Sequence, residues 1–342
     1  MARPSLDEIA KLAGCSTATV DRVLHGRPGV HPRTRDKVNK ALAQLEEEYE
    51  NKNPKPFGTS SIPQNPQRFG FIIQAGQAFT ESFLTAIEKQ QNGDRLLQIE
   101  GLGAASDEEV VEAIKGWTGG LDGLAIVSKN IPPIIDELKR LRQAGKHVMA
   151  LVSDLESSAR LAYLGIDNRA AGNVAAYLMG RHLEERSAAK VAVVVGSFSY
   201  HCHEDREIGF RSIMRQKFES IEVLEVIKGK DSDEATYDAV RKLLQVEPNI
   251  AGVYNVAGGN RGLAEALAEL QRAHSPIYIT HKFNRVTEPL LRTQQIDYLI
   301  VQDLNEIVRR ATQFMREIPS DDRQSYELES IPCRLLTQFN LG

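Results

Sequence analysis

Few cysteines and no long apolar segment are present, and each absence narrows the class of protein. The three cysteines, Cys15, Cys202 and Cys333, are odd in number and far apart, which fits a reducing compartment better than a disulfide framework. The sequence has no run of about 18 consecutive apolar residues, as a membrane helix would need. Residues 1–14 also lack the apolar core and cleavage site of a secretory signal. We therefore expect a cytoplasmic protein with no membrane partner.

Charge is distributed unevenly along the chain. Residues 1–45 contain eight Lys and Arg against four Asp and Glu, a net charge of +4; the whole chain carries −4, so the remaining 297 residues carry −8. A basic head on an acidic body indicates a module that binds a polyanion. The 42% hydrophobic and 26% charged residues are ordinary for a globular protein. A chain of 342 residues is long enough for two or three compact units.

The chain divides into three zones: a helical head at 1–45, a linker at 46–67 and a larger body at 68–342. The linker is acidic and then rich in Pro, Asn and Ser, so it has little to bury. The body alternates short apolar segments with amphipathic helices, which predicts parallel sheets in an α/β fold. Its strands are expected at 69–74, 96–101, 123–128, 147–153, 190–197, 222–227, 251–256, 277–281 and 298–302. Its helices include 107–117, 131–143, 170–184, 204–217, 233–246, 261–272 and 304–316. Nine strands are many for one sheet, so two doubly wound subdomains facing a cleft are expected.

The basic head has the local signals of a helix-turn-helix. Ser5 and Glu8 form a capping-box pattern at the start of a first helix. Gly14 ends that helix, because a sharp turn favours glycine, and Ser16 can cap the next one. The three helices are expected at 5–13, 17–24 and 33–45.

Residues 5–42 resemble the head of lac-repressor-type regulators. They read SLDEIAKLAGCSTATVDRVLHGRPGVHPRTRDKVNKAL, with the pattern A-x-x-A-G-x-S-x-x-T-V-x-R-V-L intact. The resemblance implies that Thr17, Ala18 and Arg22 face base edges in the major groove, with Arg22 as the candidate for a bidentate guanine contact. It also implies phosphate contacts, which fix the register of the head on the duplex without reading the base sequence. The residues expected to make them are Ser16, Thr19, Arg33 and Thr34. The alternative is a helical hairpin that contacts protein.

Two departures from that family pattern bear on DNA binding. Asp21 lies on the presumed DNA side, where it would accept from a cytosine amino group or orient Arg22, at a cost in phosphate affinity. Relatives of this type usually have a hinge helix whose leucine wedges into the minor groove. Here residues 46–50 are acidic, and Pro54 and Pro56 oppose a helix. We therefore expect no conventional leucine wedge.

The resemblance extends over the body, to regulators whose sensor is like a periplasmic sugar-binding protein. It implies two subdomains, 68–164 with 302–324 and 165–301 with 325–342, and ligand groups at the carboxyl ends of strands. The candidates are Phe79, Phe83, Asp154, Arg206, Asn255, His281 and Gln302. Arg206 matches the family's R-x-x-G-F pattern, and its alternative is a surface ion pair. Asp154 could accept two sugar hydroxyls or cap a turn. The two phenylalanines could stack on a sugar ring or belong to the core, and the two amides could bond to hydroxyls.

One position in the body departs from the family. Thr280, His281 and Lys282 stand where relatives usually have an aspartate near a strand end. A histidine and a lysine in place of an acid favour an anionic ligand, such as a sugar acid or phosphate. The alternative is that this position points outward.

Two other clusters resemble chemistry found elsewhere. His201-Cys202-His203-Glu204 could place two histidines on one metal ion, but no second set at ligand spacing occurs, so a loop at the cleft rim is favoured. Gly258–Gly262 could cradle a phosphate, although it lacks the Walker and dinucleotide orders, and it is expected to line the cleft. No nucleophile elbow or H-E-x-x-H occurs. We expect no metal, no cofactor and no catalysis.

The sequence therefore predicts a homodimeric transcription regulator. Its two heads would bind half-sites of a near-palindromic double-stranded DNA operator. A small effector, expected to be a carbohydrate, would close the cleft and change operator affinity. The alternative is a sugar-binding or sugar-modifying enzyme with an accessory helical head; a secreted solute-binding protein fits less well, because the head is a helix-turn-helix.

Overall fold

The computed structural model divides the chain into two compact units, 1–60 and 61–342. It describes residues 6–24, 30–31, 34–35, 37–38, 40–42, 45, 67–91, 97–104, 106–117, 120–186, 188–270, 276–319 and 322–341. The predicted linker, apart from Gln67, lies outside these residues, as do Ser5 and Arg33.

The head contains the predicted helix pair, α1 (Leu6–Ala13) and α2 (Thr17–Leu24). Gly14 between them has a φ of +65°, the left-handed geometry for which glycine was expected. The amide of Thr19 donates to Ser16 Oγ at 3.2 Å, which confirms the predicted cap of α2. The described residues from 34 to 45 are helical. The head's core consists of Ile9, Ala10, Ala13, Val20, Val38 and Ala41, with Val23, Leu42 and Leu45 partly buried against it.

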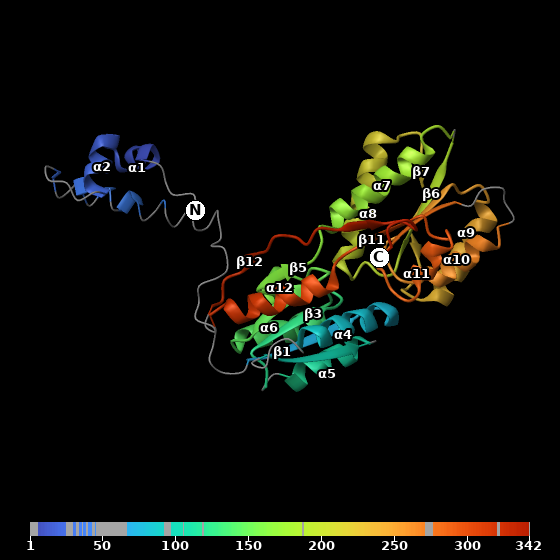
Figure 1. Cartoon of the computed structure of the whole chain (residues 1–342), viewed down its shortest axis with the longest axis horizontal. Coiled ribbons are helices and arrows are strands. Elements are labelled where there is room, and N and C mark those ends of the chain that lie inside the picture. The colour runs from blue at the N-terminus through green and yellow to red at the C-terminus, as the bar shows by residue number, and fades with distance from the viewer. Residues whose placement is uncertain are drawn as a thin grey trace. The chain divides into compact units, whose positions relative to one another are not determined.

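The body contains two sheets, each with helices on both faces, so the predicted α/β architecture is confirmed (Figure 1). The first sheet has the order β12-β5-β4-β3-β1-β2, and the second has the order β13-β11-β10-β9-β6-β7 with β8 also paired to β6. The strands of the first are β1 (Gln67–Gln74), β2 (Leu97–Ala104), β3 (Gly123–Val127), β4 (His147–Leu151), β5 (Ala162–Leu164) and β12 (Tyr326–Glu327). Those of the second are β6 (Lys190–Val195), β7 (Glu222–Val223), β8 (Ile227–Lys228), β9 (Gly252–Asn255), β10 (Ile277–His281), β11 (Tyr298–Val301) and β13 (Arg334–Leu336). All neighbouring strands are parallel except β11 and β13.

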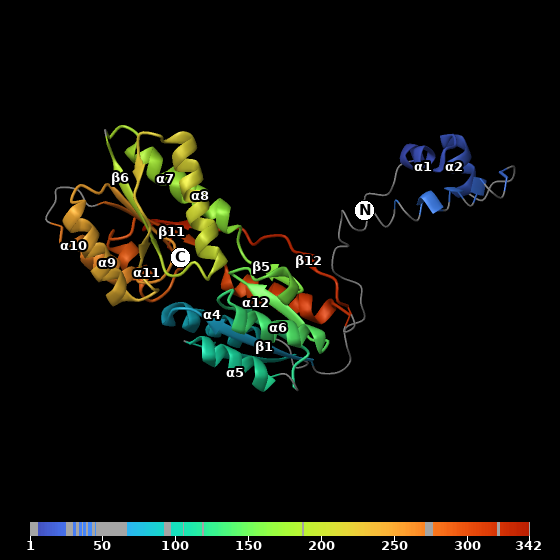
Figure 2. The same ribbon diagram turned by 180° about the vertical axis from the view of Figure 1, so that it is seen from behind.

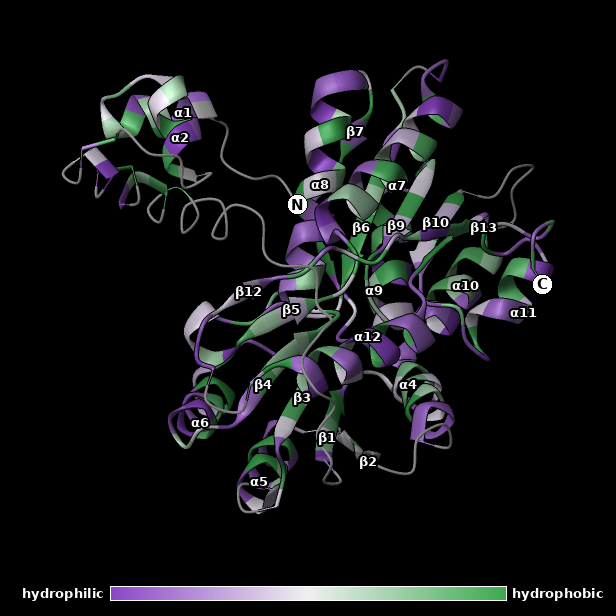
Figure 3. Cartoon of the chain, turned by 60° about the vertical axis from the view of Figure 1, so that its left-hand side comes forward, coloured by the Kyte–Doolittle hydropathy of each residue, from purple (hydrophilic) through white to green (hydrophobic). Residues whose placement is uncertain are grey.

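Amphipathic helices cover both sheets. In the first subdomain α4 packs beside α12, and α5 beside α6; in the second, α7 packs beside α8, and α9 beside α10 (Figure 2). Hydropathy follows this layering, with strongly apolar strands between helices that carry polar residues on their outer sides (Figure 3). The helices are α4 (Gln77–Gln91), α5 (Asp107–Trp117), α6 (Pro132–Gln143), α7 (Asn168–Leu183), α8 (His201–Lys217), α9 (Asp233–Val246), α10 (Asn260–Ala268), α11 (Thr287–Arg292) and α12 (Leu304–Glu317), with a 3₁₀ turn at Ser157–Ala159. None of the described helices is long and apolar enough to cross a bilayer.

The structure departs from the predicted elements in a few places. The expected strand at 222–227 is two short strands, β7 and β8. Helix α8 begins at His201, so His201 and His203 lie in its first turn and not in a loop. Strands β5, β12 and β13 were not predicted, because segments of two or three residues carry no periodic signal.

The chain passes between the two subdomains after β5, after β11 and after β12. The sequence predicted that the chain returns to the second subdomain at residue 325. In the structure β12 follows this position and still pairs with β5 in the first sheet, so the return comes after β12. This arrangement sets the carboxyl ends of the parallel strands of both sheets toward the space between the subdomains, where ligands of such folds bind.

Candidate functional site

The head exposes the residues that the sequence predicts to face DNA bases. Thr17, Ala18 and Arg22 are exposed on α2, whereas Val20 on the opposite side of the same helix is fully buried in the core. Thr19, Asp21 and Thr34 are half-buried and Ser16 is exposed. Ser16 Oγ also lies 2.9 Å from Thr19 Oγ1, so these two hydroxyls fix the start of α2 as well as being available to a phosphate. Thr17, Ala18 and Arg22 are thus accessible to a partner, and the opposite face of α2 is committed to folding.

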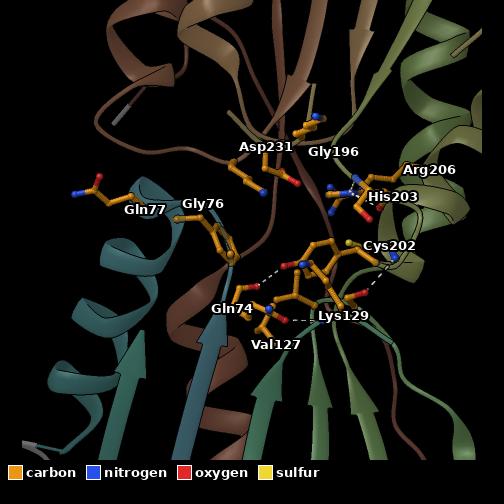
Figure 4. A pocket seen from close by; sticks show the side chains of 18 residues that line it. Gln74, Gly76, Gln77, Val127, Lys129, Gly196, Cys202, His203, Arg206 and Asp231 are labelled. Carbon is orange, nitrogen blue, oxygen red and sulfur yellow. Dashed lines mark hydrogen bonds between the residues drawn. The ribbon is translucent and has the colours of Figure 1, made fainter. Parts of the chain in front are cut away.

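A cavity of about 520 Å³ lies between the two subdomains of the body (Figure 4). Its first wall contains Gln74 and Val127, the last residues of β1 and β3, together with Lys129. Its second wall contains His203 and Arg206 from α8. In Figure 4 these side chains, and Asp231 from the second subdomain, face one space. The volume is typical of a site for a small organic ligand.

Arg206 is held in this cavity by the packing of α7 against α8. It is only 1% exposed, and its Nε donates to Asn168 Oδ1 at 2.9 Å while Nη1 donates to the carbonyl of Val256 at 2.8 Å. The two helices cross closely: a Cβ on Gly172 would lie 2.1 Å from the carbonyl oxygen of Arg206. Glycine at that crossing therefore fixes where the guanidinium enters the cavity.

Backbone strain concentrates at the cavity. Six described residues other than glycine have positive φ, and four of them line this space: Val152 (65°), Lys230 (53°), Asp231 (54°) and Lys282 (73°). Positive φ is costly for residues with a Cβ and persists where the surrounding structure enforces it, often at functional sites. The strain singles out this cavity as a candidate site, independently of its shape.

The second wall combines charged groups with a neutral histidine. Burial lowers the pKa of His203 to about 4, so its imidazole is uncharged at neutral pH. Burial raises the pKa of Asp231, but His203, Lys282 and the amide of Gly258 together bring it below its ordinary value, so the carboxylate is ionised. Burial also lowers the pKa of Lys282. Arg206 has no carboxylate within ion-pair distance among the described residues.

The first wall contains a hydrogen-bond network. Lys129 Nζ lies 2.7 Å from Asp107 Oδ1, which also accepts from Gln74 Nε2 at 2.5 Å. The backbone amide of Lys129 in turn donates to Gln74 Oε1 at 3.0 Å. The charge of Lys129 is therefore compensated within its own subdomain, while its side chain still lines the cavity.

Several polar contacts join the two walls. Tyr200 Oη donates to the carbonyl of Gln74 at 3.0 Å, and the amide of Cys202 donates to Ser153 Oγ at 3.3 Å. Lys282 Nζ lies 4.9 Å from the centre of the Phe79 ring, a cation–π contact between the subdomains. Further cross-subdomain contacts include Asn130 Nδ2 to His201 Nε2 at 3.0 Å and the paired bonds of Arg285 to Glu81 at 2.7 and 3.1 Å. The structure is thus a form in which the subdomains touch around the cavity.

Of the seven residues predicted to contact ligand, Phe79 and Arg206 line the main cavity. His281 and Gln302 line a smaller adjoining space of about 20 Å³ together with Phe79, Arg206 and Lys282. His281 is 1% exposed, and its Nε2 lies 2.7 Å from Tyr254 Oη.

Phe83, Asp154 and Asn255 are not among the residues that line either space. Phe83 is fully buried in the core beside Phe79. Asp154 pairs with Arg160, and Asn255 donates to the carbonyl of Gly258 and to Asn260 Oδ1, both at 2.9 Å. These bonds agree with the structural alternatives for the three residues, whose contact with ligand stays a prediction.

The cavity also contains residues that the sequence did not single out, above all Gln74, Lys230 and Asp231. Asp231 follows the short strand β8 and precedes α9, so its place at the carboxyl end of a strand was hidden when 222–227 was taken as one strand. Among the described residues no group of three or more His, Cys, Asp or Glu is placed to hold a metal ion.

Comparison with known proteins agrees with both parts of the chain. The bacterial regulatory proteins of the LacI family match residues 5–47, and the periplasmic binding protein domain matches residues 69–319. The chain belongs to the LacI family of regulators. Its relatives include the HTH-type transcriptional repressor PurR of Klebsiella pneumoniae, 24% identical over 257 residues, which cover 73% of this chain and 71% of the relative. PurR of Salmonella paratyphi B is 25% identical over 250 residues, 70% of this chain and 68% of the relative.

Solved structures confirm the fold of this LacI-family body. GanP, a glucose-galactose binding protein from Geobacillus stearothermophilus, matches with a TM-score of 0.72 at 17% identity, covering 81% of this chain and 99% of GanP. AraP, an arabinose binding protein from the same organism, matches with a TM-score of 0.66 at 22% identity, covering 80% and 97%. Membership of the LacI family makes the chain a DNA-binding regulator with a ligand-binding domain, and excludes the alternative that it is an enzyme.

Proposed function

We propose that the chain is a cytoplasmic, homodimeric regulator whose affinity for a near-palindromic operator is set by a sugar or sugar derivative in the cavity between the subdomains. The observation that carries the proposal is the pairing, in one chain, of an exposed recognition surface on α2 with a strained, arginine-bearing cavity in the body.

The DNA half of the proposal is supported by the division of α2 into two faces. The apolar face holds the head together, while Thr17, Ala18 and Arg22 are exposed along the other. Helix-turn-helix heads bind as pairs to half-sites about one helical turn apart, so an operator with two-fold symmetry requires a dimer. Arg22 is the residue whose guanidinium can bond in parallel to O6 and N7 of a guanine.

The effector half is supported by the chemistry of the cavity. Gln74, Asp231 and Arg206 supply amide, carboxylate and guanidinium groups, and Phe79 and Tyr200 supply rings, a mixture suited to a ligand with many hydroxyls. The neighbours GanP and AraP are named as binding glucose or galactose and arabinose. Those names belong to proteins under 25% identical, so they favour the carbohydrate class and no single sugar.

The two halves communicate through closure of the subdomains. A ligand that bridges the walls stabilises the form in which Tyr200 meets Gln74 and Lys282 meets Phe79. The position of the head in a dimer then depends on whether the cavity is filled. A coupling free energy of about 1–3 kcal/mol, typical of allosteric proteins, changes operator affinity about 5- to 150-fold.

The experiment that tests the proposal begins with selection of a preferred duplex from a random DNA library by the purified full-length chain. The selected duplex is expected to contain two inverted half-sites and to bind one dimer. Its dissociation constant is then measured by fluorescence anisotropy with and without each sugar of a panel. Selection of no sequence would contradict the DNA half, and an operator affinity that no panel member changes would contradict the effector half.

A further inference from the structure

The charge of the cavity is positive once internal pairs are taken into account. Four basic side chains, Lys129, Arg206, Lys230 and Lys282, line it against one carboxylate, Asp231. Asp107 compensates Lys129 at 2.7 Å. Three cations therefore face one anion in a space that closes around its ligand.

Lys282 is the most informative of these cations. It follows β10 with a φ of +73°, so the backbone accepts a strained conformation that directs a flexible, charged side chain into the cavity. Its Nζ rests over the Phe79 ring and makes no ion pair within 4 Å among the described residues. Asp231 acts on this lysine from beyond ion-pair distance, so the ammonium group remains available to an anionic group of a ligand.

The glycine loop at 258–262, beside the cavity, is a poor place for an anion. The amide of Gly258 donates to Asp231 Oδ1 at 2.8 Å, and the amides of Arg261 and Gly262 at the start of α10 point to Asp233 Oδ1 at 3.2 and 3.5 Å. The chain's own carboxylates therefore occupy the glycine loop that could have cradled a phosphate. An acidic ligand group would bind on the side of Lys282 and Arg206.

We propose that the effector is an acidic sugar derivative, whose carboxylate or phosphate lies between Lys282 and Arg206 while its hydroxyls bond to Asp231 and Gln74. The inference rests on the proposed function and narrows its ligand class. A neutral sugar would leave Lys282 and Arg206 desolvated with Asp231 as the one carboxylate of the cavity lining when the subdomains close, which is unfavourable. An anion satisfies both cations and gains charge-assisted hydrogen bonds.

The test compares matched probes by isothermal titration calorimetry on the full-length protein. The pairs are D-glucose with D-glucuronate, D-galactose with D-galacturonate, and D-glucose with D-glucose 6-phosphate. We expect an acidic member to bind at least about tenfold more tightly than its neutral partner. The uronates and the phosphate tell the two kinds of acidic group apart.

Lys282→Gln and Lys242→Gln provide the matched variants, since Lys242 is exposed on α9, away from the cavity. Lys282→Gln is expected to remove the preference for the acidic probe, while Lys242→Gln retains it; thermal unfolding checks that both fold. A neutral sugar that binds as tightly as its acidic partner, and shifts operator affinity, would overturn this inference and leave the proposed function standing. If neither class binds although the operator is still recognised, the sugar effector of the proposed function fails as well.

Discussion

The close crossing of α7 and α8 makes a sharp prediction at Gly172. Replacing it by alanine places a Cβ 2.1 Å from the carbonyl oxygen of Arg206 and 3.0 Å from the amide nitrogen of Phe210. Carbon–oxygen contacts in proteins are about 3.3–3.6 Å, so the helices must separate by about 1 Å. The obstacle is backbone, which cannot rotate away as a flexible side chain would.

The magnitude follows from two opposing effects. Overpacking of this kind costs about 1–3 kcal/mol, and a clash with backbone belongs at the upper end. Alanine also has a helix propensity about 1 kcal/mol better than glycine, which offsets part of the loss. We expect Gly172→Ala to lower the free energy of unfolding by about 2 kcal/mol. The displaced Arg206 should also weaken effector binding at least about tenfold, because its fork must meet the ligand in a fixed geometry.

Gly116 supplies the control for this prediction. It lies in α5, and a Cβ there would meet nothing within 4 Å, so Gly116→Ala should raise stability by about 0.5–1 kcal/mol. Urea unfolding of the two variants and the parent chain measures the difference directly. If Gly172→Ala were as stable as Gly116→Ala, the proposed positioning of Arg206 by the helix crossing would be refuted.

Three further predictions concern the head, the buried histidine and the linker. Arg22→Ala should weaken specific operator binding by about 1–3 kcal/mol and relax sequence preference; footprints unchanged from the parent would refute its contact with a base. Because the folded pKa of His203 is about 4, below its unfolded value of about 6.5, the unfolded chain binds more protons between these values. Stability should therefore be full above pH 6.5 and fall toward pH 4, and His203→Gln should flatten this part of the urea-unfolding profile; an unaltered slope would contradict the assignment. If residues 46–56 form no leucine wedge, the operator should bend little, and a strongly kinked duplex in circular-permutation gels would disprove that interpretation.

The sequence predicted the fold well because its signals are local. The turn at Gly14, the cap at Ser16 and the apolar strands of the body each depend on a few neighbouring residues, and the structure contains them, with the strand predicted at 222–227 divided into β7 and β8. The short strands β5 and β12 were not predicted, since they are defined by pairing in the sheet, of β5 with β4 and of β12 with β5, and not by periodicity.

The site was predicted less completely, for a related reason. Arg206 was found because a motif marks it, and Phe79 because it follows the first strand. Gln74 ends β1, and Lys230 and Asp231 lie between β8 and α9. These residues belong to the cavity because the fold brings the two segments together in space. Asp154 and Asn255 occupy strand ends that fit a ligand role, yet their polar atoms are bonded to Arg160, Gly258 and Asn260. A strand end places a residue near the cavity, and local partners then decide whether its side chain reaches the ligand.

The coupling between cavity and operator is tested most directly by one titration. The affinity of the full-length dimer for its selected operator is measured with and without saturating effector, for the parent chain and for Arg206→Met. The parent is expected to change its operator affinity about 5- to 150-fold on adding effector, while the variant binds the operator but does not respond. An equal response from both proteins, or none from the parent with effector shown to be bound, would contradict the account.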